Sequence, residues 1–144
     1  MDKIKWLINT VAGVAGVFAS KWLGGPDKML IALLAAMALD YVTGILVAGV
    51  FHASPKTAGG GLESRAGLKG IIRKVGMLAL VMVATQADVL MGTELARDFT
   101  VMFLCANEAL SVIENAGLMG VPVPQFLTRS FEILRDKAEG TSHE

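Results

Sequence analysis

The sequence is poor in charged residues, aromatic residues and cysteine. Of 144 residues, 18% are charged and 6% are aromatic, whereas soluble domains carry about a quarter charged residues. Cys105 is the only cysteine, which excludes a disulfide framework and a cysteine-based zinc site. The two histidines are isolated, and no nucleophile–base pair, phosphate-binding loop or metal-ligand cluster can be recognised. The sequence therefore indicates a protein that is not an enzyme and that uses no cofactor or metal.

Apolar residues are abundant instead, at 53% of the chain. They form four hydrophobic segments, at residues 4–23, 29–51, 75–91 and 99–118, each about as long as the 17–25 residues that cross a bilayer. A helix that is apolar on every side belongs in a membrane or inside a much larger protein. The sequence therefore predicts an all-α integral membrane protein. We expect one membrane domain over residues 1–144, a helical bundle of three to four transmembrane helices.

The segment at 4–23 leaves two alternatives open. Trp6 and Trp22 each lie beside a lysine and are about 24 Å apart along a helix. Because tryptophan favours the membrane interfaces, this spacing suits a first spanning helix. The alternative is an amphipathic helix that lies flat on the membrane.

Basic residues predict the orientation of the chain. The linker at 52–74 contains five basic residues against a single acid, Glu63, and the connections between the other segments hold few. The positive-inside rule then places the linker and the tail at 122–144 in the cytoplasm. Gly59, Gly60 and Gly61 make part of the linker flexible. Residues 64–74 could form a short basic helix on the membrane surface.

The tail predicts a C-terminal amphipathic helix. Pro122 and Pro124 end the fourth segment, and Leu127, Phe131 and Leu134 then recur at helical spacing. This helix is expected to pack on its own bundle or on a neighbouring subunit. Docking on the membrane surface or on another partner is the alternative.

Two acidic residues lie where the membrane midplane is expected. Asp40 and Glu108 are near the middle of their segments, and no Lys or Arg falls inside 29–51, 75–91 or 99–118. A charged residue at the centre of a span costs about 2.5–3.5 kcal/mol on the insertion scale. We therefore expect these acids to face away from lipid, with at least one of them uncharged.

The fourth segment carries a polar stripe about 120° wide. It could form hydrogen bonds between helices, with Asp40 and Thr43 as partners, or it could line water in an oligomer. Gly44 would let helices approach closely. The candidate assembly or pore residues are Asp40, Thr43, Gly44, Asn107, Glu108, Ser111, Glu114 and Asn115. The candidate basic residues of the linker are Arg65, Lys69, Arg73 and Lys74.

Four sequence blocks resemble, in order, the phage holin family of the toxin secretion/phage lysis type. They read LDYVTG at 39–44, GLKGIIRKVG at 67–76, ANEALSVIENA at 106–116 and GVPVP at 120–124. The resemblance implies a multi-pass protein of the bacterial host's cytoplasmic (inner) membrane. Such a protein associates with itself in the lipid bilayer and opens a lesion. An endolysin, or a toxin, leaves through the lesion as a passenger and not as a bound partner.

Two other functions remain open at this level. One is a small ion or solute channel subunit, and the other is a membrane regulator or antiholin that forms no pore. The 13 basic and 13 acidic residues balance, and no nucleic-acid partner is expected.

Overall fold

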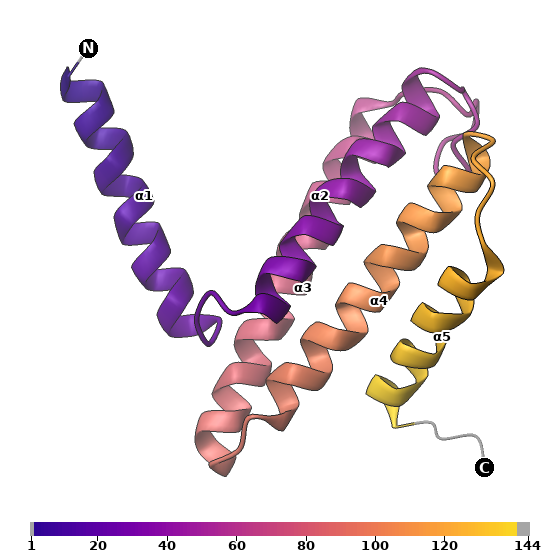
Figure 1. Ribbon diagram of the computed structural model, residues 1–144. Helices are drawn as coiled ribbons and strands as arrows, with labels where there is room; N and C mark the ends of the chain where they lie inside the picture. The colour runs from indigo at the N-terminus through magenta and orange to yellow at the C-terminus, as the bar shows by residue number, and fades with distance from the viewer. Residues whose placement is uncertain (1, 141–144) are drawn as a thin grey trace.

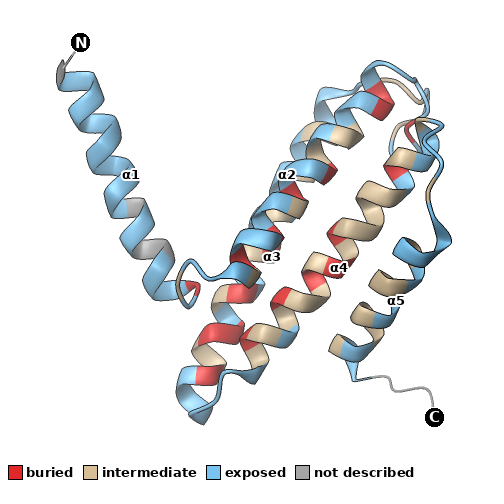
Figure 2. Cartoon of the chain, viewed as in Figure 1, coloured by how far each residue is buried: buried red, intermediate tan, exposed pale blue. Residues whose placement is uncertain are grey.

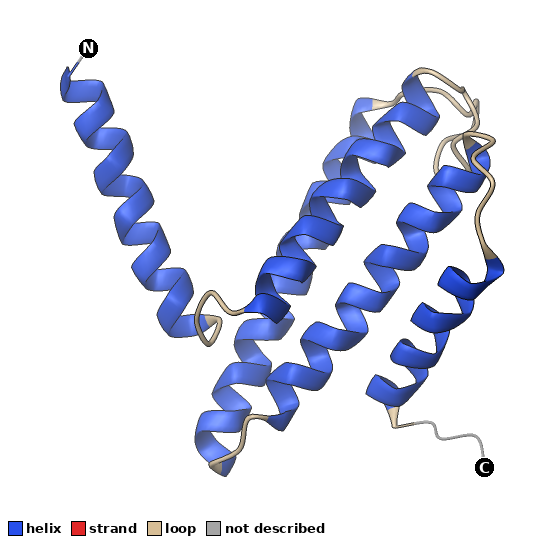
Figure 3. Ribbon diagram, viewed as in Figure 1, coloured by secondary structure: helices blue, strands red, loops and turns tan. Residues whose placement is uncertain are grey.

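The computed structural model describes residues 2–140, and every regular element in that range is an α-helix (Figure 3). The helices are α1 (Asp2–Trp22), α2 (Lys28–Gly49), α3 (Ser64–Met91), α4 (Leu95–Leu118) and α5 (Gln125–Glu139). In Figure 1, α2, α3 and α4 run side by side, while α1 leans away from them and α5 returns along α4. The predicted C-terminal amphipathic helix thus forms α5 and packs on its own bundle.

Three helices of the described chain, α2, α3 and α4, are long and apolar enough to cross a membrane. This confirms the predicted all-α membrane fold, with three helices that are suited to span a membrane. Helix α1 is not among the three. It contains Lys5, Asn9 and Lys21, which lower its hydropathy, and among the described helices it packs against α3. Apolar side chains of α1 such as Trp6 and Val14 are therefore exposed.

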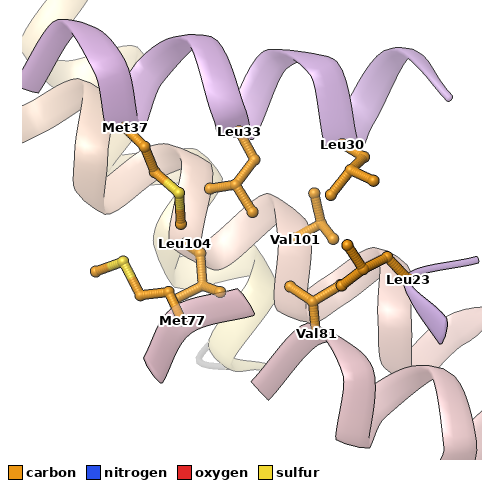
Figure 4. Packing of buried hydrophobic residues seen from close by; sticks show 8 residues of the cluster. All are labelled: Leu23, Leu30, Leu33, Met37, Met77, Val81, Val101 and Leu104. Atoms are coloured by element: carbon orange, nitrogen blue, oxygen red, sulfur yellow. The ribbon is translucent and has the colours of Figure 1, made fainter. Parts of the chain in front are cut away.

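The core lies where α2, α3 and α4 meet (Figure 4). Leu30, Leu33 and Met37 recur on one face of α2 at intervals of three and four residues, which is the spacing of a single helix face. Figure 4 shows these side chains directed at Val101 and Leu104 of α4. Met77 and Val81 of α3 close the third side of the cluster. The core is thus a narrow seam, and most other apolar side chains of the three helices face outward (Figure 2).

Helix α4 is the central element of the bundle. It packs against α2, α3 and α5, so it is covered on opposite faces. Glu108 and Ala106 project from nearly opposite sides of α4, yet they are 3% and 0% exposed. A helix covered on both sides can carry polar residues on one side without presenting them to lipid.

The third helix extends further upstream than the apolar run. α3 begins at Ser64, whereas the apolar run alone suggested 75–91. Leu68 and Ile71 continue the helical pattern upstream of that run, so the predicted surface helix and the span form one continuous helix. The connection from α2 is correspondingly shorter, and Lys74 lies within α3, in the same helix as the third apolar run.

Arg97 and Asp88 hold together one end of the bundle. Arg97 is buried, and its Nε donates to the Leu23 carbonyl at 2.7 Å while Nη1 lies 2.7 Å from Asp27 Oδ2. The backbone N–H groups of Ala96 and Arg97 donate to the Asp88 carboxylate at 2.9 and 2.7 Å. Asp88 therefore satisfies amide donors in the first turn of α4, which otherwise lack a partner within the helix. The α1–α2 and α3–α4 connections are joined by these contacts.

Asp27 links this end to the start of α2. Its side chain accepts a hydrogen bond from the Leu30 amide at 2.8 Å, as expected of an N-cap residue. The hydrogen bond from Arg97 is the main cause that lowers the pKa of Asp27 below its ordinary value. A lowered pKa means that the unfolded chain binds the proton more tightly. This contact therefore stabilises the fold above pH ~4 and is lost as the pH falls through the folded-state pKa.

Substitutions of Gly24 and Gly25 test how much the hydrogen bonds of Arg97 stabilise this end of the bundle. Both have positive φ, +80° and +94°, so alanine is strained at either position. A Cβ on Gly24 would overlap the Arg97 side chain, whereas a Cβ on Gly25 would meet nothing within 4 Å. We expect Gly24→Ala to lower the free energy of unfolding by about 2 kcal/mol more than Gly25→Ala, because it displaces hydrogen bonds of a buried charged group. Denaturant unfolding in detergent measures the difference. Equal losses of unfolding free energy in the two variants would contradict a stabilising role of the Arg97 hydrogen bonds.

Single cysteines test the orientation in a Cys105→Ala background. Ala58 and Glu94 are exposed in the connections at opposite ends of the bundle. A membrane-impermeant maleimide on intact cells should label Glu94→Cys and spare Ala58→Cys until the cells are permeabilised. Labelling of Ala58→Cys in intact cells would reverse the orientation. Lys3→Cys should be spared if α1 spans the membrane, and its labelling from outside would place α1 flat on the outer surface.

Candidate functional site

A single lysine joins the three spanning helices near their middle. Lys74 Nζ of α3 lies 2.8 Å from Asp40 Oδ2 of α2 and also forms an ion pair with Glu108 Oε2 of α4. Asp40 and Glu108 are buried, and the Lys74 side chain is 16% exposed. We call these three residues the ionic centre. Each spanning helix contributes one charged group to it.

Asn115 extends the ionic centre toward the end of α4. Its Nδ2 donates to Thr43 Oγ1 at 2.9 Å and to Asp40 Oδ1 at 3.3 Å. Ser111, one turn earlier on α4, lies beside the same carboxylate. In the described part of the chain, no buried side-chain nitrogen or oxygen lacks a hydrogen-bond partner. The buried side-chain polar atoms therefore find their partners within one chain.

The expectation that Asp40 and Glu108 lack a cationic partner is wrong. It followed from starting the third helix at residue 75, which left Lys74 outside that helix, whereas α3 begins at Ser64. Burying ions costs several kcal/mol each, and the cost is offset only when they are paired and hydrogen-bonded. Lys74 pairs with both acids, so they no longer lack a cation, and the expectation that at least one of them is uncharged stays a prediction. With all three groups ionised, the ionic centre has one excess negative charge.

The structure separates the members of the predicted polar stripe. Glu108, Ser111 and Asn115 lie on the side that meets Asp40, while Asn107 is half-buried and Glu114 is exposed. The stripe therefore has a paired part inside the chain and an outer part. The predicted hydrogen bonding to Asp40 and Thr43 describes the geometry of the inner part. Glu114 and Asn107 are not brought into the ionic centre.

Small residues let α2 approach its neighbours around the ionic centre. A Cβ on Gly44 would lie 3.9 Å from Asn115 Nδ2, so this glycine faces α4 of the same chain. Gly67 and Gly70 of α3 face the Tyr41 ring and hydroxyl, at 3.7–3.8 Å from an added Cβ. The Tyr41 side chain thus fills the space that two glycines leave on α3.

A pocket of about 280 Å³ leads to the ionic centre from the α2–α3 connection. Asp40, Lys74 and Glu108 line it together with residues of the connection. That connection is folded on itself, since the Ser54 amide donates to the Gly60 carbonyl at 3.0 Å and Thr57 Oγ1 donates to the Gly61 carbonyl at 2.9 Å. Lys69 and Arg73 also line the pocket, whereas Arg65 does not. The four predicted basic residues therefore occupy different surroundings.

The sequence position of Lys74 predicts its pairing with Asp40 and Glu108, although a search for continuous apolar runs misses it. Asp40 lies nine residues before the end of α2, and Lys74 lies ten residues after the start of α3. Two residues at nearly the same distance from the turn between antiparallel helices meet at about the same level. Glu108 is 34 residues after Lys74, as Lys74 is after Asp40. Arg97 has no comparable signal, because its partners include the backbone carbonyl of Leu23.

Replacement of Lys74 should show how much the ionic centre contributes to the free energy of unfolding. Lys74→Met leaves two buried carboxylates without a counter-ion, and breaking a buried pair typically costs about 3–5 kcal/mol. Adding Asp40→Asn and Glu108→Gln to Lys74→Met should recover most of that loss. Unfolding of the purified variants in detergent provides the measurement. Arg73→Met is the matched control, because Arg73 is exposed and forms no ion pair with any described residue. Equal losses for Lys74→Met and Arg73→Met would show that the ionic centre contributes little.

Comparisons with known proteins agree on one family. The model of the bacteriophage holin family matches residues 17–136. An uncharacterised protein of Listeria innocua is 33% identical over 93% of this chain and 89% of its own length. A second, from Halalkalibacterium halodurans, is 34% identical over 92% and 93%. A probable holin of Bacillus phage phi105 is 32% identical over 81% of each chain. No solved structure matches the chain significantly. The matched residues include the whole of α2, α3 and α4 with the ionic centre, and the chain belongs to the bacteriophage holin family.

Proposed function

We propose that this protein is a holin that associates with itself in the bacterial cytoplasmic membrane and opens a lesion. An endolysin would leave the cytoplasm through the lesion as a passenger. The observation that carries the proposal is the ionic centre: charged and amide groups are buried inside a bundle whose outer surface is largely apolar. Family membership and the similarity to a probable holin of a Bacillus phage support the same function.

The buried polar groups suggest how the same chain can adopt a closed state and an open state. A single copy satisfies Asp40, Lys74 and Glu108 internally and presents apolar side chains to lipid. In a ring of copies, water can replace these internal partners if the helices separate. The helix surface needed to line a hole is therefore already present in each copy. The step from closed to open then consists of exchanging intrachain pairs for water.

The position of α5 supports self-association. α5 runs along α4, and charged residues on its outer face, such as Arg129, Glu132 and Lys137, are exposed. Because charged side chains facing lipid are costly, this face needs water or another protein beside it. A second copy of the chain is the partner that we propose. The apolar exposed side chains of α1 offer further surface for the same association.

Expression with and without an endolysin tests the function directly. A holin stops growth and collapses the membrane potential alone, but the culture clears only when the endolysin is present. Leakage of ions without release of the enzyme would instead identify a small channel. No effect alone, together with delayed lysis by another holin, would identify a regulator.

Replacement of the ionic centre by apolar residues tests the mechanism. Asp40→Leu, Lys74→Met and Glu108→Met together should preserve folding, because apolar residues often replace a buried ion network without loss of stability. The triple variant should accumulate in the membrane as the wild type does and yet fail to lyse cells that express the endolysin. Immunoblots of membranes and culture turbidity measure the two outcomes. Lysis on the wild-type schedule would mean that the ionic centre serves the fold alone.

A further inference from the structure

We propose that the pocket between α2, α3 and their connection binds the phosphate of an anionic phospholipid headgroup. The pocket has a volume of about 280 Å³ and is lined by three exposed cations, Lys56, Lys69 and Arg73. Glu63 is the exposed acid on the same lining, so the exposed groups leave an excess of positive charge. Such basic pockets between membrane helices suit phosphate headgroups.

The three cations have no counter-ion within the described chain. Lys56, Lys69 and Arg73 form no ion pair with any residue in the range 2–140, whereas Lys74 at the pocket's inner end is paired twice. The first turn of α3 also lines the pocket, and its N-cap residue makes no side-chain hydrogen bond to it. The positive end of the α3 dipole therefore adds to the charge of the side chains. A bound anion would offset the positive charge of the three side chains and of the α3 N-terminus.

The apolar part of the pocket favours a lipid over a free ion. Ile45 and Val47 of α2 and Leu62 of the connection contribute apolar wall beside the cations. The volume admits a phosphate with its glycerol but not acyl chains. Leu62 and Leu68, which are 63% and 58% exposed, offer apolar surface on which the chains could rest. The cations of the site thus suit a lipid headgroup, and its apolar residues suit the acyl chains.

Titration of the purified full-length protein in neutral detergent tests the site. The probes are short-chain phosphatidylglycerol, short-chain phosphatidylcholine and inorganic phosphate, and the readout is the shift in unfolding temperature. Phosphatidylglycerol should stabilise the protein, and the other two probes should not. Lys69→Gln with Arg73→Gln should weaken the response to phosphatidylglycerol by about 30-fold. Lys5→Gln with Arg65→Gln removes the same charge outside the pocket lining and should change the response by less than about threefold.

A second variant keeps the test decisive if the charge variants fold poorly. Ala66 lines the pocket, and Ala66→Leu narrows it without a change of charge, so it should also weaken the response to phosphatidylglycerol. Unchanged binding by Ala66→Leu, or equal weakening by the two charge pairs, would overturn the proposal. Stabilisation by inorganic phosphate alone would assign the pocket to the free ion and overturn the lipid. Equal stabilisation by phosphatidylcholine would show that headgroup charge is not recognised.

Discussion

One ammonium group shared by two carboxylates constrains the arrangement of the spanning helices. Lys74 fixes α3 against Asp40 of α2 and Glu108 of α4 at a single level. Because an unpaired ion is far more costly in the bilayer than in water, none of the three helices can slide or rotate alone without leaving a charge unpaired. The ionic centre therefore restricts the register of the bundle in addition to the packing of the core.

The two ends of the bundle differ in how they are held. At one end Arg97 and Asp88 join the connections through hydrogen bonds to backbone groups, and the Gly24 backbone lies against Arg97. At the other end a pocket separates α2 from α3, and exposed cations line it. Separation of the helices would therefore begin at the pocket end and proceed toward the ionic centre. A lipid phosphate bound there would oppose that opening, which connects the proposed site to the proposed function.

Much of this architecture follows from the sequence because bilayer physics restricts the choices. The length and composition of the apolar runs predict α2 and α4 closely, and helical periodicity in the tail predicts α5. The failure at α3 has a physical cause. Its first turns are amphipathic and basic, so a criterion of continuous hydrophobicity begins the helix too late and leaves Lys74 outside it. The pairing of Asp88 with amides of α4 and of Arg97 with a backbone carbonyl depends on tertiary geometry that residue types do not encode.

Water accessibility of Ser111 tests the central claim most directly, since Ser111 lies beside the Asp40 carboxylate. In a Cys105→Ala background without endolysin, Ser111→Cys should not react with a small water-soluble maleimide before the membrane potential collapses, and it should react afterwards. Ile31→Cys, at an exposed apolar position of α2, should stay unreactive throughout. Reaction of Ser111→Cys only after collapse would show that the ionic centre is exchanged for water on opening. An unreactive Ser111→Cys in cells whose potential has collapsed would contradict the account.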